Sequence, residues 1–137
     1  MPKLNAILET ALYVADLARA DLFYRETLGL RCIYADFRMR AFDVGGRGVL
    51  LLFPEGGSLS PIETPGGCIP PHDGRGPAHI AFSIDADALA VWEDHLAAAG
   101  IAVAGRTRWP RGGISLYFRD PDGHLLELAT PGLWKGY

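Results

Sequence analysis

Three residues of this 137-residue chain have side chains that commonly bind metals, and they occur in similar local sequences. They are Glu9 in ILETALYV, His79 in HIAFSI and Glu127 in HLLELA. Each stretch alternates in the manner of a β-strand, and in each an alanine follows the candidate ligand two residues later. Because side chains alternate across a strand, that alanine lies on the ligand's face and leaves room for a bound molecule.

Two carboxylates and an imidazole that converge inside a cavity would be costly to desolvate without a partner. A divalent cation supplies that partner, and this donor set suits Mn²⁺, Fe²⁺, Co²⁺, Ni²⁺ or Mg²⁺ at least as well as Zn²⁺. Three protein ligands would leave coordination positions open, so the metal would act as a Lewis acid on a small substrate with two adjacent oxygens. Taken singly, each residue is more commonly a surface carboxylate, an ion-pair partner or a core histidine.

The elements that must position these residues follow the same order in both halves of the chain. In the first half we expect a strand at 7–14, a helix at 17–28 between the cap Asp16 and Gly29, and strands at 31–36, 39–44 and 49–53. In the second half we expect a strand at 79–84, a helix between the candidate caps Asp85 and Asp87 and Gly100, and strands at 102–108, 114–119 and 124–129. This order is an internal repeat.

The repeat sets a register between the two halves. Glu9 aligns with His79 at an offset of 70 residues, and Leu51 aligns with Glu127 at an offset of 76. We therefore expect an α+β fold of two tandem βαβββ modules that form a curved, half-open mixed β-sheet with helices on its convex face. Module one spans about 5–54 and module two about 78–130. A loop at 55–77 joins them, and a tail at 131–137 completes one domain.

Strand parity assigns further residues to the concave side of the sheet. The expected substrate contacts are Tyr13, Met39, Ala41, Ser83, Ser115, Tyr117 and Arg119, and the candidate catalytic residues are Glu9, Glu127 and Tyr117. For Arg119 we favour pairing with Asp120, and His124 is expected on the helix side as a residue that is not a ligand. The loop residues His72, Asp73 and Arg75 could close over a pocket, although polar residues are common in any loop.

Composition narrows the class of protein. The net charge is −3 without a basic stripe, so nothing indicates nucleic-acid binding. No run of about 18 apolar residues occurs, so we expect no membrane span. The first residues lack the apolar core of a signal peptide. Cys32 and Cys68 lack metal-ligand spacing, so we expect two free thiols in a reducing cytoplasm.

The repeated modules, with LYVADLARADLFYRETLGL, GPAHIAFSI and YFRDPDGHLLELATP, resemble the vicinal oxygen chelate superfamily over about residues 5–130. That group includes glyoxalase I, fosfomycin-modifying enzymes, extradiol dioxygenases and bleomycin-binding proteins. The resemblance implies a metal-dependent lyase, isomerase or oxygenase that works as a homodimer, with the metal held by Glu9, His79 and Glu127. It also places Tyr117 where fosfomycin-type enzymes have a tyrosine that contacts substrate.

This sequence departs from the family pattern at two of the ligand positions. Many members have histidine where this chain has Glu9, and that carboxylate could also act as a base. Glyoxalase I has a carboxylate that moves protons where this chain has Leu51, which argues against glyoxalase I activity. The alternatives are a metal-free protein that sequesters a drug or metabolite, as bleomycin-binding members do, and a domain whose carboxylates only form ion pairs.

Overall fold

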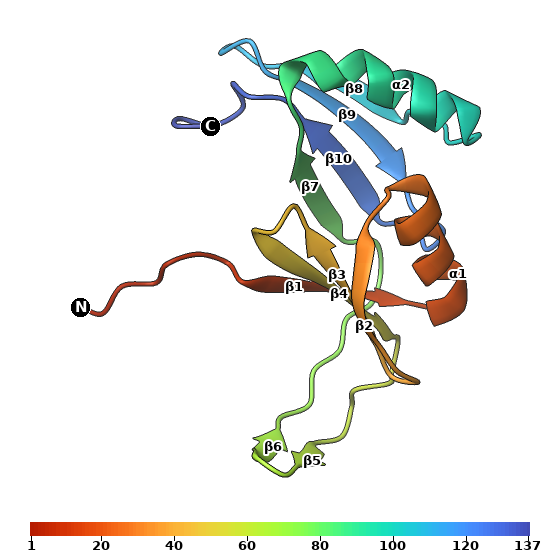
Figure 1. Ribbon diagram of the computed structural model, residues 1–137, viewed down its shortest axis with the longest axis vertical. Helices are drawn as coiled ribbons and strands as arrows, with labels where there is room; N and C mark the ends of the chain where they lie inside the picture. Colours follow the sequence, from red (N-terminus) through yellow and green to blue (C-terminus); the bar gives the residue numbers. More distant parts are fainter. The chain divides into compact units, whose positions relative to one another are not determined.

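The computed structural model describes residues 1–137 and consists of two compact units, Met1–Arg75 and Gly76–Tyr137 (Figure 1). Each unit contains one four-stranded mixed sheet and one main helix. The two units therefore correspond to the two modules that the repeat predicts.

Unit 1 carries the first module and most of the connecting loop. Its elements are β1 (Glu9–Val14), α1 (Leu17–Leu22), a π-helical turn (Phe23–Thr27), β2 (Arg31–Ala35), β3 (Arg40–Val44) and β4 (Gly48–Pro54), followed by the short hairpin of β5 (Ile62–Thr64) and β6 (Gly67–Ile69). The sheet order is β1-β4-β3-β2, with β1 parallel to β4 and the other pairs antiparallel.

Unit 2 repeats this topology. Its elements are β7 (His79–Ser83), a 3-10 turn (Ala86–Ala88), α2 (Leu89–Ala98), β8 (Gly105–Arg108), β9 (Ile114–Arg119) and β10 (Leu125–Ala129). The sheet order is β7-β10-β9-β8, and β7 is again parallel to β10. The first and last strands of each module therefore lie side by side, which is the arrangement that the candidate ligands require.

The strand register confirms the predicted alignment of the repeat. Ala11 lies opposite Leu51 in unit 1, and Ala81 lies opposite Glu127 in unit 2. The strands β4 and β10 each pair with a second strand as well. Leu51 on β4 lies opposite Ala41 on β3, and Glu127 on β10 lies opposite Tyr117 on β9. Glu127 thus occupies the position in its sheet that Leu51 occupies in the other.

In each unit the helical segment packs on one face of the sheet, against the apolar side chains that the strands place on that face. In unit 1 the ring of Tyr24 is fully buried and lies 6.0 Å from the ring of Phe42, and in unit 2 Leu96 is buried along with Leu116 and Phe118. Burial of such side chains contributes roughly 1.5–3 kcal/mol each, so this packing holds the strands in place.

The start of α1 agrees with the prediction, and the start of α2 does not. Oδ1 of Asp16 accepts hydrogen bonds from the backbone N–H groups of Ala18 and Arg19, as an N-cap does. Neither Asp85 nor Asp87 caps α2 with its side chain, and the helix begins at Leu89. The reason is the preceding 3-10 turn, in which the backbone carbonyl of Asp85 accepts from Ala88 N–H.

Two further expectations differ from the structure. The predicted strand at 102–108 begins only at Gly105, because Ile101 N–H still donates to the carbonyl of Leu96 at the end of the helix. The loop at 55–77 contains the β5–β6 hairpin, whose turn is held by the hydroxyl of Thr64 donating to the Gly67 carbonyl. No helix is long and apolar enough to cross a membrane.

Candidate metal and substrate site

Glu127 and His79 come together in unit 2. Glu127 lies on β10, the strand between β7 and β9, and its side chain is almost fully buried. His79 begins the adjacent strand β7 and is half exposed, with Nε2 3.1 Å from Oε2 of Glu127. The pair therefore has one buried carboxylate and one imidazole that opens towards solvent.

The other ring nitrogen of His79, Nδ1, determines which tautomer the imidazole adopts. Nδ1 lies 2.9 Å from the backbone carbonyl of Leu125, and a carbonyl can only accept a hydrogen bond. Nδ1 therefore carries the hydrogen, and in the neutral ring Nε2 directs a lone pair towards the carboxylate of Glu127. Two lone pairs at this distance repel unless a proton or a metal ion lies between them, so the pair can form an ion pair with a protonated imidazole or supply two ligands to a metal ion.

Ser115 holds the remaining oxygen of Glu127. Its side chain is fully buried, its hydroxyl donates to Oε1 of Glu127, and its oxygen accepts from Nε1–H of Trp109 at 2.8 Å. The hydroxyl is thus engaged by two protein groups, and a substrate contact by Ser115 stays a prediction. Ser115 fixes the orientation of a candidate metal ligand, and the sequence contained no signal for the bond to Trp109.

Glu9 belongs to the other unit, where its exposed side chain lines a cavity of about 660 Å³. In neither unit does the structure gather three histidine, cysteine, aspartate or glutamate side chains around a common point. Of the three predicted ligands, the structure therefore brings two together, and the part played by Glu9 remains a prediction.

The cavity of unit 1 lies on the face of β1 and β4 that the helix does not cover. Tyr13 and Met39 line it, whereas Ala41 is buried and does not. The complete lining is Glu9, Thr10, Ala11, Tyr13, Tyr34, Asp36, Arg38, Met39, Leu51, Phe53, Thr64, Ile69 and His72. Most of these are apolar or aromatic, which is typical of pockets for small molecules.

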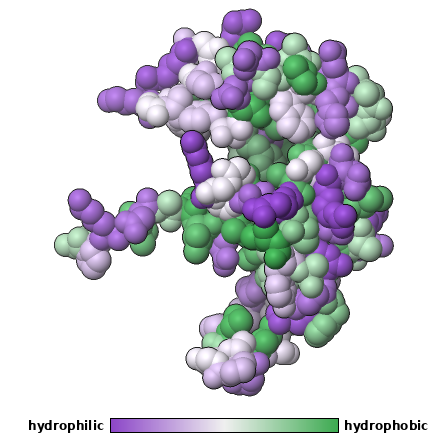
Figure 2. Space-filling view, viewed as in Figure 1, coloured by the Kyte–Doolittle hydropathy of each residue, from purple (hydrophilic) through white to green (hydrophobic).

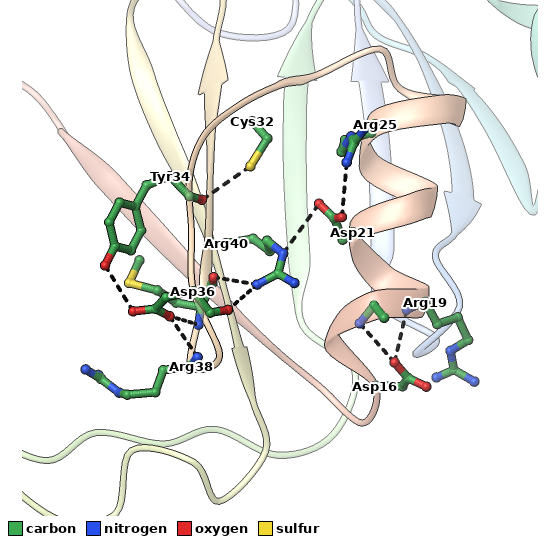
Figure 3. Close-up of polar contacts among 11 residues, drawn as sticks. Asp16, Arg19, Asp21, Arg25, Cys32, Tyr34, Asp36, Arg38 and Arg40 are labelled. Atoms are coloured by element: carbon green, nitrogen blue, oxygen red, sulfur yellow. Dashed lines mark hydrogen bonds and ion pairs between the residues drawn. The ribbon is translucent and has the colours of Figure 1, made fainter.

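A tight loop at 36–39 forms one wall of this cavity (Figure 3). Oδ1 of Asp36 accepts from the backbone N–H groups of Arg38 and Met39, and its Oδ2 accepts from the hydroxyl of Tyr34. Burial raises the pKa of Asp36, but these hydrogen bonds and the positive charge of Arg38 lower it by more, so the net pKa lies below its ordinary value. The carboxylate is thus fully engaged, while the guanidinium of Arg38 forms no hydrogen bond or ion pair.

His72 reaches the same cavity from the connecting loop. Its Nδ1 lies 2.6 Å from the hydroxyl of Tyr13, and its ring packs edge-on against Phe53 with centroids 4.7 Å apart. Of the loop residues that could close over a pocket, His72 lines the cavity. Asp73 does not line it and instead accepts a hydrogen bond from the backbone N–H of Gly56.

The other predicted site residues lie in unit 2. Tyr117 is half-buried beside His79, with ring centroids 6.4 Å apart, and Ser83 is exposed at the end of β7. Arg119 donates to the carbonyl of Gly123 rather than pairing with Asp120, whose carboxylate is buried within the turn and accepts from the backbone N–H of His124. His124 is buried and its Nδ1 accepts from Ala78 N–H.

Fold and site together define a class of protein: two tandem βαβββ modules, with a carboxylate–imidazole pair on the parallel strands β10 and β7 of the second. The model of the Glyoxalase/Bleomycin resistance protein/Dioxygenase superfamily matches residues 6–128, and the chain belongs to that superfamily.

Several known proteins are similar to this chain. The metallothiol transferase FosB of Bacillus licheniformis is 34% identical over 118 residues, which cover 85% of this chain and 70% of the relative. The crystal structure of lactoylglutathione lyase from Agrobacterium tumefaciens has a TM-score of 0.88 and 35% identity, and the match covers 97% of this chain and 98% of that one. The fosfomycin resistance protein FosX from Mesorhizobium loti has a TM-score of 0.61 and 25% identity, covering 95% and 93%.

Proposed function

We propose that this protein is a metal-dependent enzyme that uses a divalent cation with open coordination positions on a small substrate with vicinal oxygens. The observation that carries the proposal is the facing pair of Oε2 of Glu127 and Nε2 of His79, 3.1 Å apart. The hydroxyl of Ser115 holds the carboxylate, and the carbonyl of Leu125 holds the imidazole. A metal ligand pair needs such outer partners to fix its orientation.

The chain's own residues have separate tasks in this proposal. His79 and Glu127 bind the ion, and Glu9 is the third ligand because it occupies the place of His79 in the first repeat. A bound cation would supply Lewis-acid chemistry, stabilising negative charge on a substrate oxygen. Tyr117, beside His79 and opposite Glu127 on the neighbouring strand, would contact the substrate. Its phenolic hydroxyl can donate to an oxygen or accept from a hydroxyl.

The names of the relatives support a substrate class. They include metallothiol transferases, a glutathione transferase from Serratia marcescens and a lactoylglutathione lyase, all of which act on a thiol or its conjugate. We therefore propose that this enzyme handles a small oxygen-bearing molecule together with a thiol, or a conjugate of the two. A panel of fosfomycin with glutathione or cysteine, and lactoylglutathione itself, tests this class directly. Absence of turnover on every member, with metal bound, would exclude it.

Replacing Glu9 with glutamine removes its negative charge and keeps its size. If Glu9 is a ligand, metal affinity is expected to fall by about tenfold or more, and turnover with it. If Glu9 also moves a proton, turnover will fall further than the loss of metal accounts for. Titration with metal and assay at saturating metal separate the two roles. The matched control is Glu26→Gln, an exposed residue of the π-helical turn, and unchanged metal binding and turnover in Glu9→Gln would refute both roles.

We also propose that the protein is a homodimer. The segment ahead of β1 extends away from the strand with several apolar side chains in solvent (Figure 2), and Leu4, Ile7 and Leu8 are 98%, 82% and 74% exposed. Trp134 in the tail is 71% exposed. Apolar surface of this kind is typical of a protein interface. Light scattering is expected to give twice the 14.8 kDa chain mass, and a monomer at all concentrations would exclude the dimer.

A further inference from the structure

The indole of Trp109 is the outer end of a chain of hydrogen bonds that leads to Glu127. Its Nε1–H can only donate, so the hydroxyl oxygen of Ser115 accepts it, at 2.8 Å. The hydrogen of that hydroxyl is then directed to Oε1 of Glu127. Ser115 is fully buried, whereas Trp109 lies in the turn ahead of β9. The direction of the hydroxyl, and with it the position of the carboxylate, therefore depends on where the turn holds the indole.

Backbone contacts hold this turn against the tail at 131–137. The N–H of Trp109 donates to the carbonyl of Gly113 at 2.8 Å, and the carbonyl of Trp109 accepts from Gly112 N–H at 2.9 Å. A Cβ on Gly113 would lie 2.7 Å from the backbone carbonyl carbon of Gly132, which is closer than a side chain approaches a backbone. The turn and the tail thus touch backbone to backbone, and only glycine at position 113 leaves room for that contact.

The tail returns to the end of β10, the strand that it leaves. Gly132 N–H donates to the carbonyl of Tyr137 at 2.9 Å, which closes the tail into a loop. The hydroxyl of Tyr137 donates to the carbonyl of Ala129 at 3.1 Å, and Ala129 lies two residues after Glu127 on the same strand. The strand that carries Glu127 and the turn that carries Trp109 are therefore both fixed to the same short segment.

We propose that Trp109 is a positioning residue for Glu127 that acts through Ser115, and that the tail is the element that holds Trp109 in place. The inference rests on the proposed function in taking Glu127 as a metal ligand. It makes the metal affinity of the site depend on a turn and a tail that lie outside the set of ligands. Every residue in this chain of contacts belongs to unit 2.

Hydrogen exchange of the indole tests the role of the tail in the full chain labelled with ¹⁵N. The three tryptophans give three indole N–H signals in NMR spectra, and Trp109→Phe identifies the signal of Trp109. This N–H is expected to exchange slowly with water, because it is bonded to a buried hydroxyl. Gly113→Ala adds a Cβ that overlaps the tail and should speed the exchange by about tenfold or more. Unchanged exchange in Gly113→Ala would overturn the role of the tail.

A milder variant and a control accompany this measurement. Tyr137→Phe loses only the hydroxyl that bonds to Ala129, so it should fold normally and shift the exchange rate in the same direction. The control is Gly66→Ala in the β5–β6 hairpin, where a Cβ would reach only ordinary contact distance, 3.9 Å from the hydroxyl of Thr64. It should leave the exchange of Trp109 unchanged. If Gly113→Ala does not fold, Tyr137→Phe decides the role of the tail.

Metal affinity provides the second readout. Titration with Zn²⁺ is expected to give an affinity about threefold to tenfold lower in Trp109→Phe and in Gly113→Ala than in the unmodified protein. When Ser115→Ala is already present, neither change should lower the affinity further, because the connection to Glu127 is already broken. Unchanged affinity in Trp109→Phe, or an equal fall with and without Ser115→Ala, would refute the inference. Unmodified protein that takes up no Zn²⁺ would instead refute the proposed function, while the exchange measurement still decides whether the tail holds Trp109.

Discussion

Replacing His79 with alanine is expected to abolish stoichiometric metal binding and to reduce turnover to background. Nε2 of His79 is the nitrogen donor that faces the buried carboxylate of Glu127, and the carbonyl of Leu125 holds it there. Removal of an outer partner of a ligand commonly costs about 10–100-fold in metal affinity, and removal of the ligand itself should cost more. Metal titration followed by calorimetry, and turnover at saturating metal, measure the two effects.

The matched control for this variant is His95→Ala, which removes a histidine from the exposed side of α2. It is expected to keep both metal and turnover. Because the side chain of His79 is half exposed, His79→Ala should fold normally, and its thermal midpoint without metal should be close to that of the unmodified protein. If His79→Ala bound metal with unchanged affinity, the pairing of His79 and Glu127 would have to be explained as a simple ion pair.

Replacing Ser115 with alanine is expected to lower both stability and metal affinity. The hydroxyl of Ser115 bridges Oε1 of Glu127 and Nε1–H of Trp109, and the side chains of Ser115 and Glu127 are buried. Its loss leaves a buried acceptor and a donor without a partner, which costs about 1–3 kcal/mol of unfolding free energy. Glu127 would also lose its fixed orientation, so metal affinity should fall by about 10–100-fold. Chemical denaturation and metal titration measure these effects.

The double variant Ser115→Ala with Trp109→Phe separates the two contributions. It removes the unpaired N–H of the indole but leaves Oε1 of Glu127 unpaired, so part of the stability should return while metal affinity stays low. Ser60→Ala in the exposed part of the loop is the control for replacing a serine. Full metal affinity in Ser115→Ala would show that Ser115 does not position the ligand.

Sequence patterns were sufficient for the elements that depend on alternation and repetition. The strand parity that placed Ala11 and Tyr13 on one face of β1 is confirmed by the burial of Leu12 and Val14 on the opposite face. The register in which Glu127 takes the place of Leu51 is confirmed by the strand pairs. Both follow from local periodicity, which the sequence carries directly.

Contacts between distant residues could not be predicted in the same way. Parity places Ser115 on the same face as Tyr117, but whether a hydroxyl meets a substrate or a buried carboxylate depends on which side chains cover it. Here Trp109, in a turn outside the strand, donates a hydrogen bond to the hydroxyl of Ser115. The bond from His72 to Tyr13 likewise joins a loop without periodicity to a strand 59 residues away.

Metal analysis of the protein purified without chelator decides whether it is a metal-dependent enzyme. Elemental analysis is expected to find a stoichiometric divalent ion in the unmodified protein and none in Glu127→Gln, which keeps the shape of the side chain but loses its charge. The identity of the ion also indicates the chemistry, since Fe²⁺ with oxygen uptake favours an oxygenase and Mn²⁺ or Ni²⁺ without it favours a lyase, an isomerase or a transferase. Protein that is free of metal, takes up none on titration and still binds a ligand tightly would contradict the account and identify a sequestering protein instead.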